Sequence, residues 1–131
     1  MEPDYKYERV ILVDDNHIDN IIHEKIILSS NYAKQVISFE SAIKAIDFLK
    51  KVDLSNQDEP VIIFLDLRMP EMDGYGFLHQ LKTLQNLPPA KLKIHVLSSS
   101  LDPLDRRKIG KSQLTESFIS KPLTAEILKQ L

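Results

Sequence analysis

The stretch that decides the fold lies near the middle of the chain and reads Val61-Ile62-Ile63-Phe64-Leu65-Asp66. Its five apolar residues are consecutive, a pattern typical of a strand that is buried on both faces of a parallel sheet. A carboxylate, Asp66, follows at the point where such a strand would end. Shorter apolar runs at 10–13, 94–97 and 118–119 predict three more strands, and a weaker run at 36–39, interrupted by Ser38, predicts an edge strand.

Segments with helical periodicity separate the apolar runs and predict five helices. Asn16, Ser41 and Thr124 precede three of them, and Asp102-Pro103 supplies an N-cap and a first-turn proline for a short fourth helix. The apolar stripes of the other four helices consist of Ile18, Ile21, Ile22 and Ile26; of Ala42, Ala45, Ile46 and Leu49; of Phe77, Leu78, Leu81 and Leu84 after Gly74; and of Ile127, Leu128 and Leu131.

Strand and helix alternate five times, which predicts an α/β fold of (βα)5 type. The strands would be parallel, the crossovers right-handed and the helices spread over both sheet faces. The chain has 131 residues, which predicts one domain over 1–131 and leaves little room for a separate effector domain, so we expect none in this chain. With 43% hydrophobic and 27% charged residues it has the composition of an ordinary globular protein.

Charge and residue usage exclude several function classes. A net charge of −2 gives no reason to expect nucleic acid or an anionic membrane surface as a partner, and Arg106-Arg107-Lys108 is interpreted as a solvated helix face. The absence of cysteine excludes disulfides, thiolate zinc sites and thiol catalysis. The N-terminus has no secretory pattern and the run at 61–65 is too short to span a bilayer, so we expect a cytoplasmic protein.

The four histidines do not form a ligand pattern. His17 and His23 are six residues apart, rather than the four that place two ligands on one helical face. We therefore expect solvated helix positions for His17, His23 and His79, and a strand position with a hydrogen-bonded ring for His95.

Polar groups follow the strands at the edge where their carboxyl ends should meet, which is where ligands bind in open parallel sheets. Each group has an ordinary structural interpretation, such as a helix cap or a polar loop, but chance would scatter such groups over both edges. They are Asp14 and Asp15 after the first strand, Asp66 after the central strand, Ser98-Ser99-Ser100 after the fourth, and Lys121 after the fifth.

The charge of this cluster indicates its ligand. Three carboxylates and one ammonium leave an excess of negative charge, which a divalent cation would compensate. Oxygen ligands without histidine or cysteine favour Mg²⁺ over zinc. A bound Mg²⁺ together with Lys121 would form a pocket for a phosphoryl group.

Three stretches resemble the response-regulator receiver family: Val10 to Asn16 with its acidic pair, Leu65 to Gly74 with the Met-Pro and Asp-Gly turn, and Phe118 to Thr124 with its Lys-Pro ending. The resemblance runs from about residue 9 to the C-terminus, the expected core of the domain. It implies the flavodoxin-like strand order 2-1-3-4-5. It also implies a two-component or phosphorelay protein that accepts a phosphoryl group from a phosphohistidine.

The resemblance further implies a role for each matching residue. Asp66 would be the phosphoacceptor, and Lys121 would pair with the phosphoryl oxygens. Ser98, or failing that Ser99, would supply the switch hydroxyl at the end of the fourth strand, and Phe118 would be the aromatic switch residue. Mg²⁺ (or Mn²⁺) would be bound directly by Asp15 and Asp66, by Asp14 through a water, and by the backbone carbonyl of Arg68.

The leading hypothesis is therefore a conformational switch, with a sensor histidine kinase or a histidine phosphotransfer protein as phosphodonor. Its output would be a protein contact through the fourth helix, fifth strand and fifth helix. One alternative is a degenerate receiver that binds partners without phosphorylation, although no motif residue is missing. The other is an aspartate-nucleophile phosphohydrolase, which needs an Asp two residues after the nucleophile, where this chain has Arg68.

Overall fold

The computed structural model describes residues 4–53, 58–99 and 102–131 of the chain. Five strands form one parallel sheet in the order β2-β1-β3-β4-β5, as predicted. The weak run at 36–39 lies in an edge strand, also as predicted. The strands are β1 Tyr7–Val13, β2 Ala33–Phe39, β3 Val61–Asp66, β4 Leu92–Ser98 and β5 Thr115–Ser120.

In the described ranges, four α-helices and one short 3₁₀ segment, Pro89–Lys91, connect the strands, and a fifth α-helix follows the last strand. Asn16, Ser41, Asp102 and Thr124 each accept a backbone N–H of the helix that follows, so the predicted caps are confirmed. The third helix is shorter than its apolar stripe, because it ends at Leu81 and Leu84 lies beyond it. The helices are α1 His17–Ser29, α2 Ala42–Leu49, α3 Gly74–Leu81, α4 Pro103–Gly110 and α5 Ala125–Gln130.

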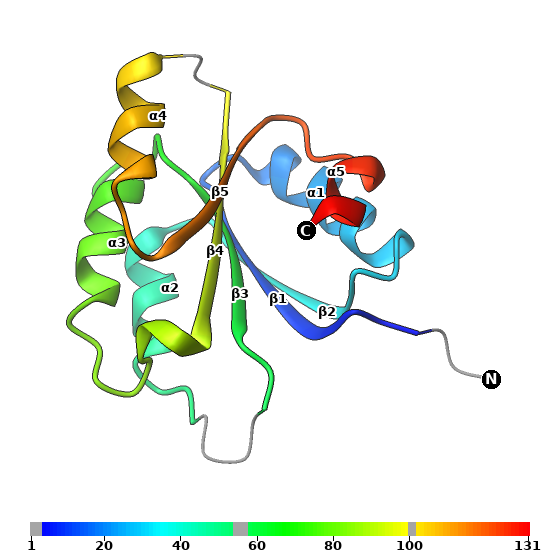
Figure 1. The fold of residues 1–131 in the computed structure, drawn as a ribbon, viewed down its shortest axis with the longest axis horizontal. Coiled ribbons are helices and arrows are strands. Elements are labelled where there is room, and N and C mark those ends of the chain that lie inside the picture. The colour runs from blue at the N-terminus through cyan, green and yellow to red at the C-terminus, as the bar shows by residue number, and fades with distance from the viewer. Residues whose placement is uncertain (1–3, 54–57, 100–101) are drawn as a thin grey trace.

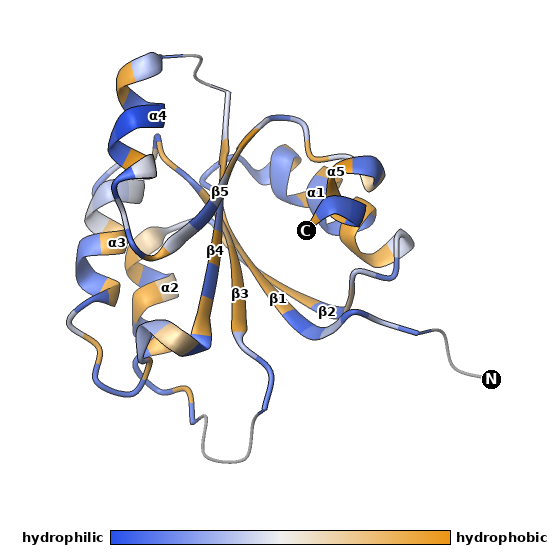
Figure 2. Ribbon diagram, viewed as in Figure 1, coloured by the Kyte–Doolittle hydropathy of each residue, from blue (hydrophilic) through white to orange (hydrophobic). Residues whose placement is uncertain are grey.

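The helices cover both faces of the sheet: α2, α3 and α4 lie on one face, and α1 and α5 on the other (Figure 1). Each face has its own core. Ile63 and Leu65 of β3 belong to the first core, and Ile62 and Phe64 belong to the second. Because every residue of β3 is buried between the two helix layers, this strand carries the continuous apolar run that Figure 2 shows as an orange band through the sheet.

Helix α1 leaves three of the four isoleucines of its predicted stripe exposed, and only Ile26 packs partly buried against the core. Ile18, Ile21 and Ile22 are 65%, 43% and 45% exposed, and the buried positions are Asn20, His23 and Ile27. The side-chain amide of Asn20 donates to the backbone carbonyl of Asp14 at 2.8 Å, which orients this polar face of α1 toward the end of β1. The prediction of a solvated His23 is therefore wrong, since this residue is 2% exposed.

None of the helices in the described ranges is long and apolar enough to cross a bilayer.

Candidate functional site

The three predicted carboxylates converge at the carboxyl edge of the sheet. Asp14 and Asp15 directly follow β1, and Asp66 is the last residue of the neighbouring strand β3. Each offers one oxygen atom, and these oxygens all lie within 4.8 Å of one another. Asp14 and Asp66 are buried, whereas Asp15 is exposed. One side of the cluster is therefore open to a ligand from solvent.

Lys121 joins the carboxylates from the loop after β5. Its Nζ donates to Asp14 at 2.7 Å and to Asp19 at 2.9 Å, and lies 3.5 Å from Oδ1 of Asp66. Burial alone would lower the pKa of Lys121, but the hydrogen bonds to Asp14 and Asp19 raise it above its ordinary value. The ammonium is therefore charged at neutral pH.

The backbone brings Lys121 to this position. The Lys121 N–H donates to the Ser98 carbonyl at 3.0 Å, which ties the loop after β5 to the end of β4. The Lys121–Pro122 peptide bond is cis. The predicted meeting of the first, third and fifth strand ends is thus present in the structure.

Asp66 is held in an environment that disfavours its charged form. Burial raises the pKa of Asp66 to about 6, the neighbouring Asp14 adds to the rise, and Lys121 opposes it. A cation that joined the three carboxylates would lower this pKa and keep Asp66 ionised.

The donor set fits a hard divalent cation. Asp14, Asp15 and Asp66 are the only group of three His, Cys, Asp or Glu side chains with metal-binding spacing in the described residues. They offer only oxygen, which suits Mg²⁺ or Mn²⁺ better than zinc. The nearby His17 belongs elsewhere, because its exposed ring lies 2.9 Å from Glu40.

Ser98 is the switch candidate that lies at the site. It is the last residue of β4 and is 1% exposed, whereas the fallback Ser99 is exposed; Ser100 lies outside the described residues. Phe118 is half-buried in β5 and packs against the core under α2, α3 and α4. The Arg106 guanidinium of α4 lies 5.1 Å from the centre of the Phe118 ring.

The Arg68 side chain pairs with Asp105 of α4. The Tyr75 hydroxyl donates to the same carboxylate at 2.5 Å. Asp105 is 4% exposed. Burial raises the pKa of Tyr75, and the hydrogen bond to Asp105 raises it further. The segment after the phosphoacceptor candidate is thereby joined to α4.

Sequence reasoning missed two polar contacts of the site region, Asp19–Lys121 and Arg68–Asp105. Asp19 has a sequence signal only as an acid in the first turn of a helix, which is a common stabilising position. Asp105 has the same signal in α4, and nothing in the sequence indicates its partners Arg68 and Tyr75, which lie 37 and 30 residues away in the chain.

The remaining histidines are partly as predicted. His79 is exposed, and His95 lies in β4 with Nδ1 2.7 Å from the Ser117 hydroxyl. Burial lowers the pKa of His95 to about 4. His23 is buried, and its Nδ1 has no hydrogen-bond partner within the part of the chain that the structure describes.

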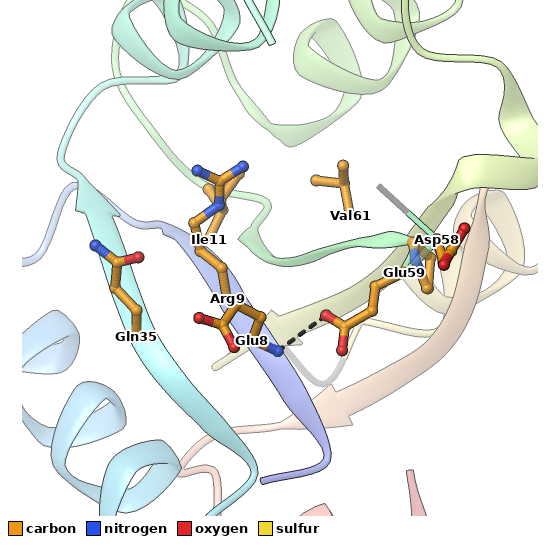
Figure 3. A pocket seen from close by; sticks show the side chains of 8 residues that line it. Glu8, Arg9, Ile11, Gln35, Asp58, Glu59 and Val61 are labelled. Atoms are coloured by element: carbon orange, nitrogen blue, oxygen red, sulfur yellow. Dashed lines mark hydrogen bonds between the residues drawn. The ribbon is translucent and has the colours of Figure 1, made fainter. Parts of the chain in front are cut away.

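A separate cavity of about 420 Å³ opens at the other edge of the sheet (Figure 3). It is lined by the first residues of β1 and β3, including Arg9 and Val61, and by Glu59, which accepts the backbone N–H of Glu8 at 2.9 Å. Because Val61 and Asp66 are opposite ends of the same strand, this cavity is not part of the carboxylate site.

Residues 10–131 match the response regulator receiver domain. The match includes the last four residues of β1, the other four strands in full and all the converging side chains. The chain belongs to the response regulator receiver family.

Individual receivers agree in sequence and in fold. A two-component response regulator of rice (Oryza sativa subsp. japonica) is 34% identical over 94% of this chain, which spans about half (53%) of the length of the rice protein. The crystal structure of a two-component response regulator from Cytophaga hutchinsonii has a TM-score of 0.84 at 32% identity, covering 94% of this chain and 92% of that one.

A more distant structure extends the likeness of fold. The receiver domain of a sensor histidine kinase from Pseudomonas aeruginosa PAO1, with a magnesium ion coordinated in its active site cleft, has a TM-score of 0.72 at 20% identity. It covers 94% of this chain and 92% of that chain.

Proposed function

We propose that this receiver is a phosphoacceptor switch that takes a phosphoryl group from a phosphohistidine onto Asp66. The observation that carries the proposal is the joint placement of the three carboxylate oxygens, within 4.8 Å of one another, beside the Nζ of Lys121, 3.5 Å from Asp66. A carboxylate nucleophile next to a cation suits phosphoryl transfer, because this reaction depends on positioning and charge neutralisation.

The transfer step follows from these positions. An Asp66 carboxylate oxygen attacks phosphorus and forms an O–P bond, while the P–N bond of the phosphohistidine breaks. The imidazole nitrogen leaves with the electron pair of that bond and takes a proton from solvent. Lys121 donates hydrogen bonds to the phosphoryl oxygens, and the product is an acyl phosphate on Asp66.

The carboxylates also provide for Mg²⁺ or Mn²⁺. Asp15 and Asp66 would bind it directly, Asp14 through a water and Arg68 through its backbone carbonyl. When bound, the cation neutralises negative charge on the phosphoryl oxygens. The magnesium ion in the active site cleft of the Pseudomonas receiver supports the choice of magnesium for this site.

The phosphodonor would be a protein, either a sensor histidine kinase or a histidine phosphotransfer protein. The exposed Ile18, Ile21 and Ile22 support this, since α1 begins two residues after Asp15 and presents apolar surface near the site. A small phosphodonor would have no use for such a surface.

The switch would act through the opposite side of the site. Phosphorylation gives Ser98 and Lys121 a new charged partner, which would draw in the end of β4 and shift α4 and Phe118. Of the residues of α4, only Asp105 and Ile109 are buried, so few apolar contacts oppose this movement. A downstream protein would read the face formed by α4, β5 and α5.

The test is incubation with phosphoramidate and Mg²⁺, followed by intact-mass measurement. We expect one phosphoryl adduct on the wild type and none on Asp66→Asn or after chelation with EDTA. Continuous turnover of a phosphorylated substrate would instead indicate the phosphohydrolase. A folded wild type without an adduct would support the degenerate receiver.

A further inference from the structure

We propose that Asp19 is a positioning residue of this site: it retains the Lys121 ammonium in the unphosphorylated protein and so restrains phosphorylation of Asp66. The inference rests on the proposed function and adds a fourth carboxylate to the site. Asp19 comes from α1, whereas the other carboxylates follow or end strands β1 and β3.

The contacts of Lys121 carry the inference. Its Nζ lies 2.9 Å from Asp19 Oδ2 and 2.7 Å from Asp14 Oδ2, but 3.5 Å from Oδ1 of Asp66. The Lys121 side chain is 13% exposed, so few water molecules compete for the ammonium. Its two short hydrogen bonds therefore go to groups other than the phosphoacceptor.

The ammonium has three hydrogen-bond donors, and two of them are used by Asp14 and Asp19. A phosphoryl group on Asp66 would need at least one further donor and a shift of Nζ toward it. Asp19 opposes that shift by direct attraction. Its negative charge also repels an incoming anionic phosphodonor.

Asp19 is not one of the three carboxylates whose oxygens come within metal-binding range of each other. Its side chain is 32% exposed, so water and salt screen its charge more than the charges of Asp14 and Asp66. Removing its charge should therefore make the surroundings of Lys121 less negative without removing a predicted Mg²⁺ ligand.

A purely structural role for Asp19 predicts a different result. As an acid in the first turn of α1, it also interacts favourably with the helix dipole. The cap of this helix uses the backbone N–H of Asp19, which donates to Asn16 Oδ1 at 3.0 Å and is retained in any side-chain variant. A structural role alone would change unfolding midpoints and leave phosphorylation kinetics unchanged.

The experiment measures phosphorylation by phosphoramidate at saturating Mg²⁺, and Mg²⁺ affinity separately by titration calorimetry. For Asp19→Asn we expect a roughly three- to tenfold faster phosphorylation and a roughly two- to fivefold weaker Mg²⁺ affinity, because one negative charge is lost near the site. Asp19→Glu, which keeps the charge, should return both values toward those of the wild type. Glu24→Gln removes one charge elsewhere on the same helix and should change neither.

Phosphorylation of Asp19→Asn at or below the wild-type rate would overturn the inference while leaving the proposed function intact. So would an equal acceleration in Glu24→Gln or in Asp19→Glu, since the effect would then not depend on the Asp19 charge beside Lys121. A wild type that forms no adduct at all would overturn the inference and the proposed function together.

Discussion

At the scale of single residues, the phosphoacceptor candidate carries an energetic penalty that its neighbours only partly relieve. Asp66 is buried beside Asp14, and the two shortest hydrogen bonds of Lys121 go to Asp14 and Asp19. Because its charged form is disfavoured, the Asp66 carboxylate is stabilised by a bound cation or by a reaction that spreads its negative charge. Reactivity and local instability thus have the same cause.

This penalty predicts a pH-dependent stability difference between the wild type and Asp66→Asn in EDTA. The pKa of Asp66 is raised from 3.8 to about 6, so the folded protein binds this proton more tightly than the unfolded chain. The stabilisation is complete below pH 3.8 and is lost as the pH rises through about 6. At pH 7.5, Asp66→Asn should be more stable than the wild type by about 2–3 kcal/mol.

Urea unfolding of both proteins at pH 7.5 and at pH 5 checks this prediction. The advantage of Asp66→Asn should shrink at the lower pH, where the wild-type carboxyl is protonated. Asp47→Asn is the matched control, because Asp47 is an exposed acid on α2 and should show no such difference. An advantage that stays constant over this pH range would contradict the argument.

At the scale of elements, the start of α3 depends on the absence of a side chain at its first residue. A Cβ on Gly74 would lie 2.7 Å from the Asp66 carbonyl oxygen and 2.8 Å from Cα of Leu67. Both contacts are with backbone and cannot be relieved by a side-chain rotation. The Gly74 N–H also donates to the Leu67 carbonyl at 2.9 Å, which holds the helix against the end of β3.

Gly74→Ala should therefore destabilise the protein by about 2 kcal/mol or more, since backbone must move to accommodate the methyl group. It should also slow phosphorylation, because the displaced backbone includes Asp66. The control is Gly110→Ala at the end of α4, where a Cβ meets nothing within 4 Å. That variant should gain about 0.5–1 kcal/mol from its better helix propensity. Shifts of the urea midpoint in the same direction for the two variants would contradict the prediction.

At the scale of the whole molecule, one sheet separates two cores, and a titratable side chain, His95, is buried on this sheet. His95 of β4 lies in register between Phe64 of β3 and Ser117 of β5, with its ring 5.2 Å from that of Phe64. Burial lowers the pKa of His95 from 6.5 to about 4, so the folded protein holds the neutral ring. Between these two pH values, protonation of the ring therefore favours the unfolded chain.

The contribution of His95 to the free energy of unfolding should therefore fall as the pH drops from 6.5 to about 4, by up to roughly 3 kcal/mol, in the opposite sense to the contribution of Asp66. The unfolded chain binds a proton in this range that the folded chain does not. Urea unfolding should show that the stability of His95→Gln relative to the wild type increases between pH 7 and pH 5. His79→Gln, which changes an exposed ring on α3, should keep the wild-type pH dependence.

Residue pattern alone sufficed for most of the architecture. The continuous run that ends in Asp66 predicts a strand buried on both faces, and the caps and the alternation of elements predict the helices between strands. In a parallel sheet all strands end at one edge. The positions of Asp14, Asp15, Asp66 and Lys121 after the strands were therefore also enough to predict that these side chains lie together. The strand order came from the family resemblance.

Only the tertiary structure decided the rotation of α1 and the partners of the charged side chains. Periodicity identifies an apolar stripe but not whether a polar anchor such as Asn20 turns the opposite face toward the sheet. Likewise, the contacts of Lys121 with Asp19 and of Arg68 with Asp105 join residues 102 and 37 positions apart. Such pairings depend on how helices dock onto the sheet, and local sequence does not encode that geometry.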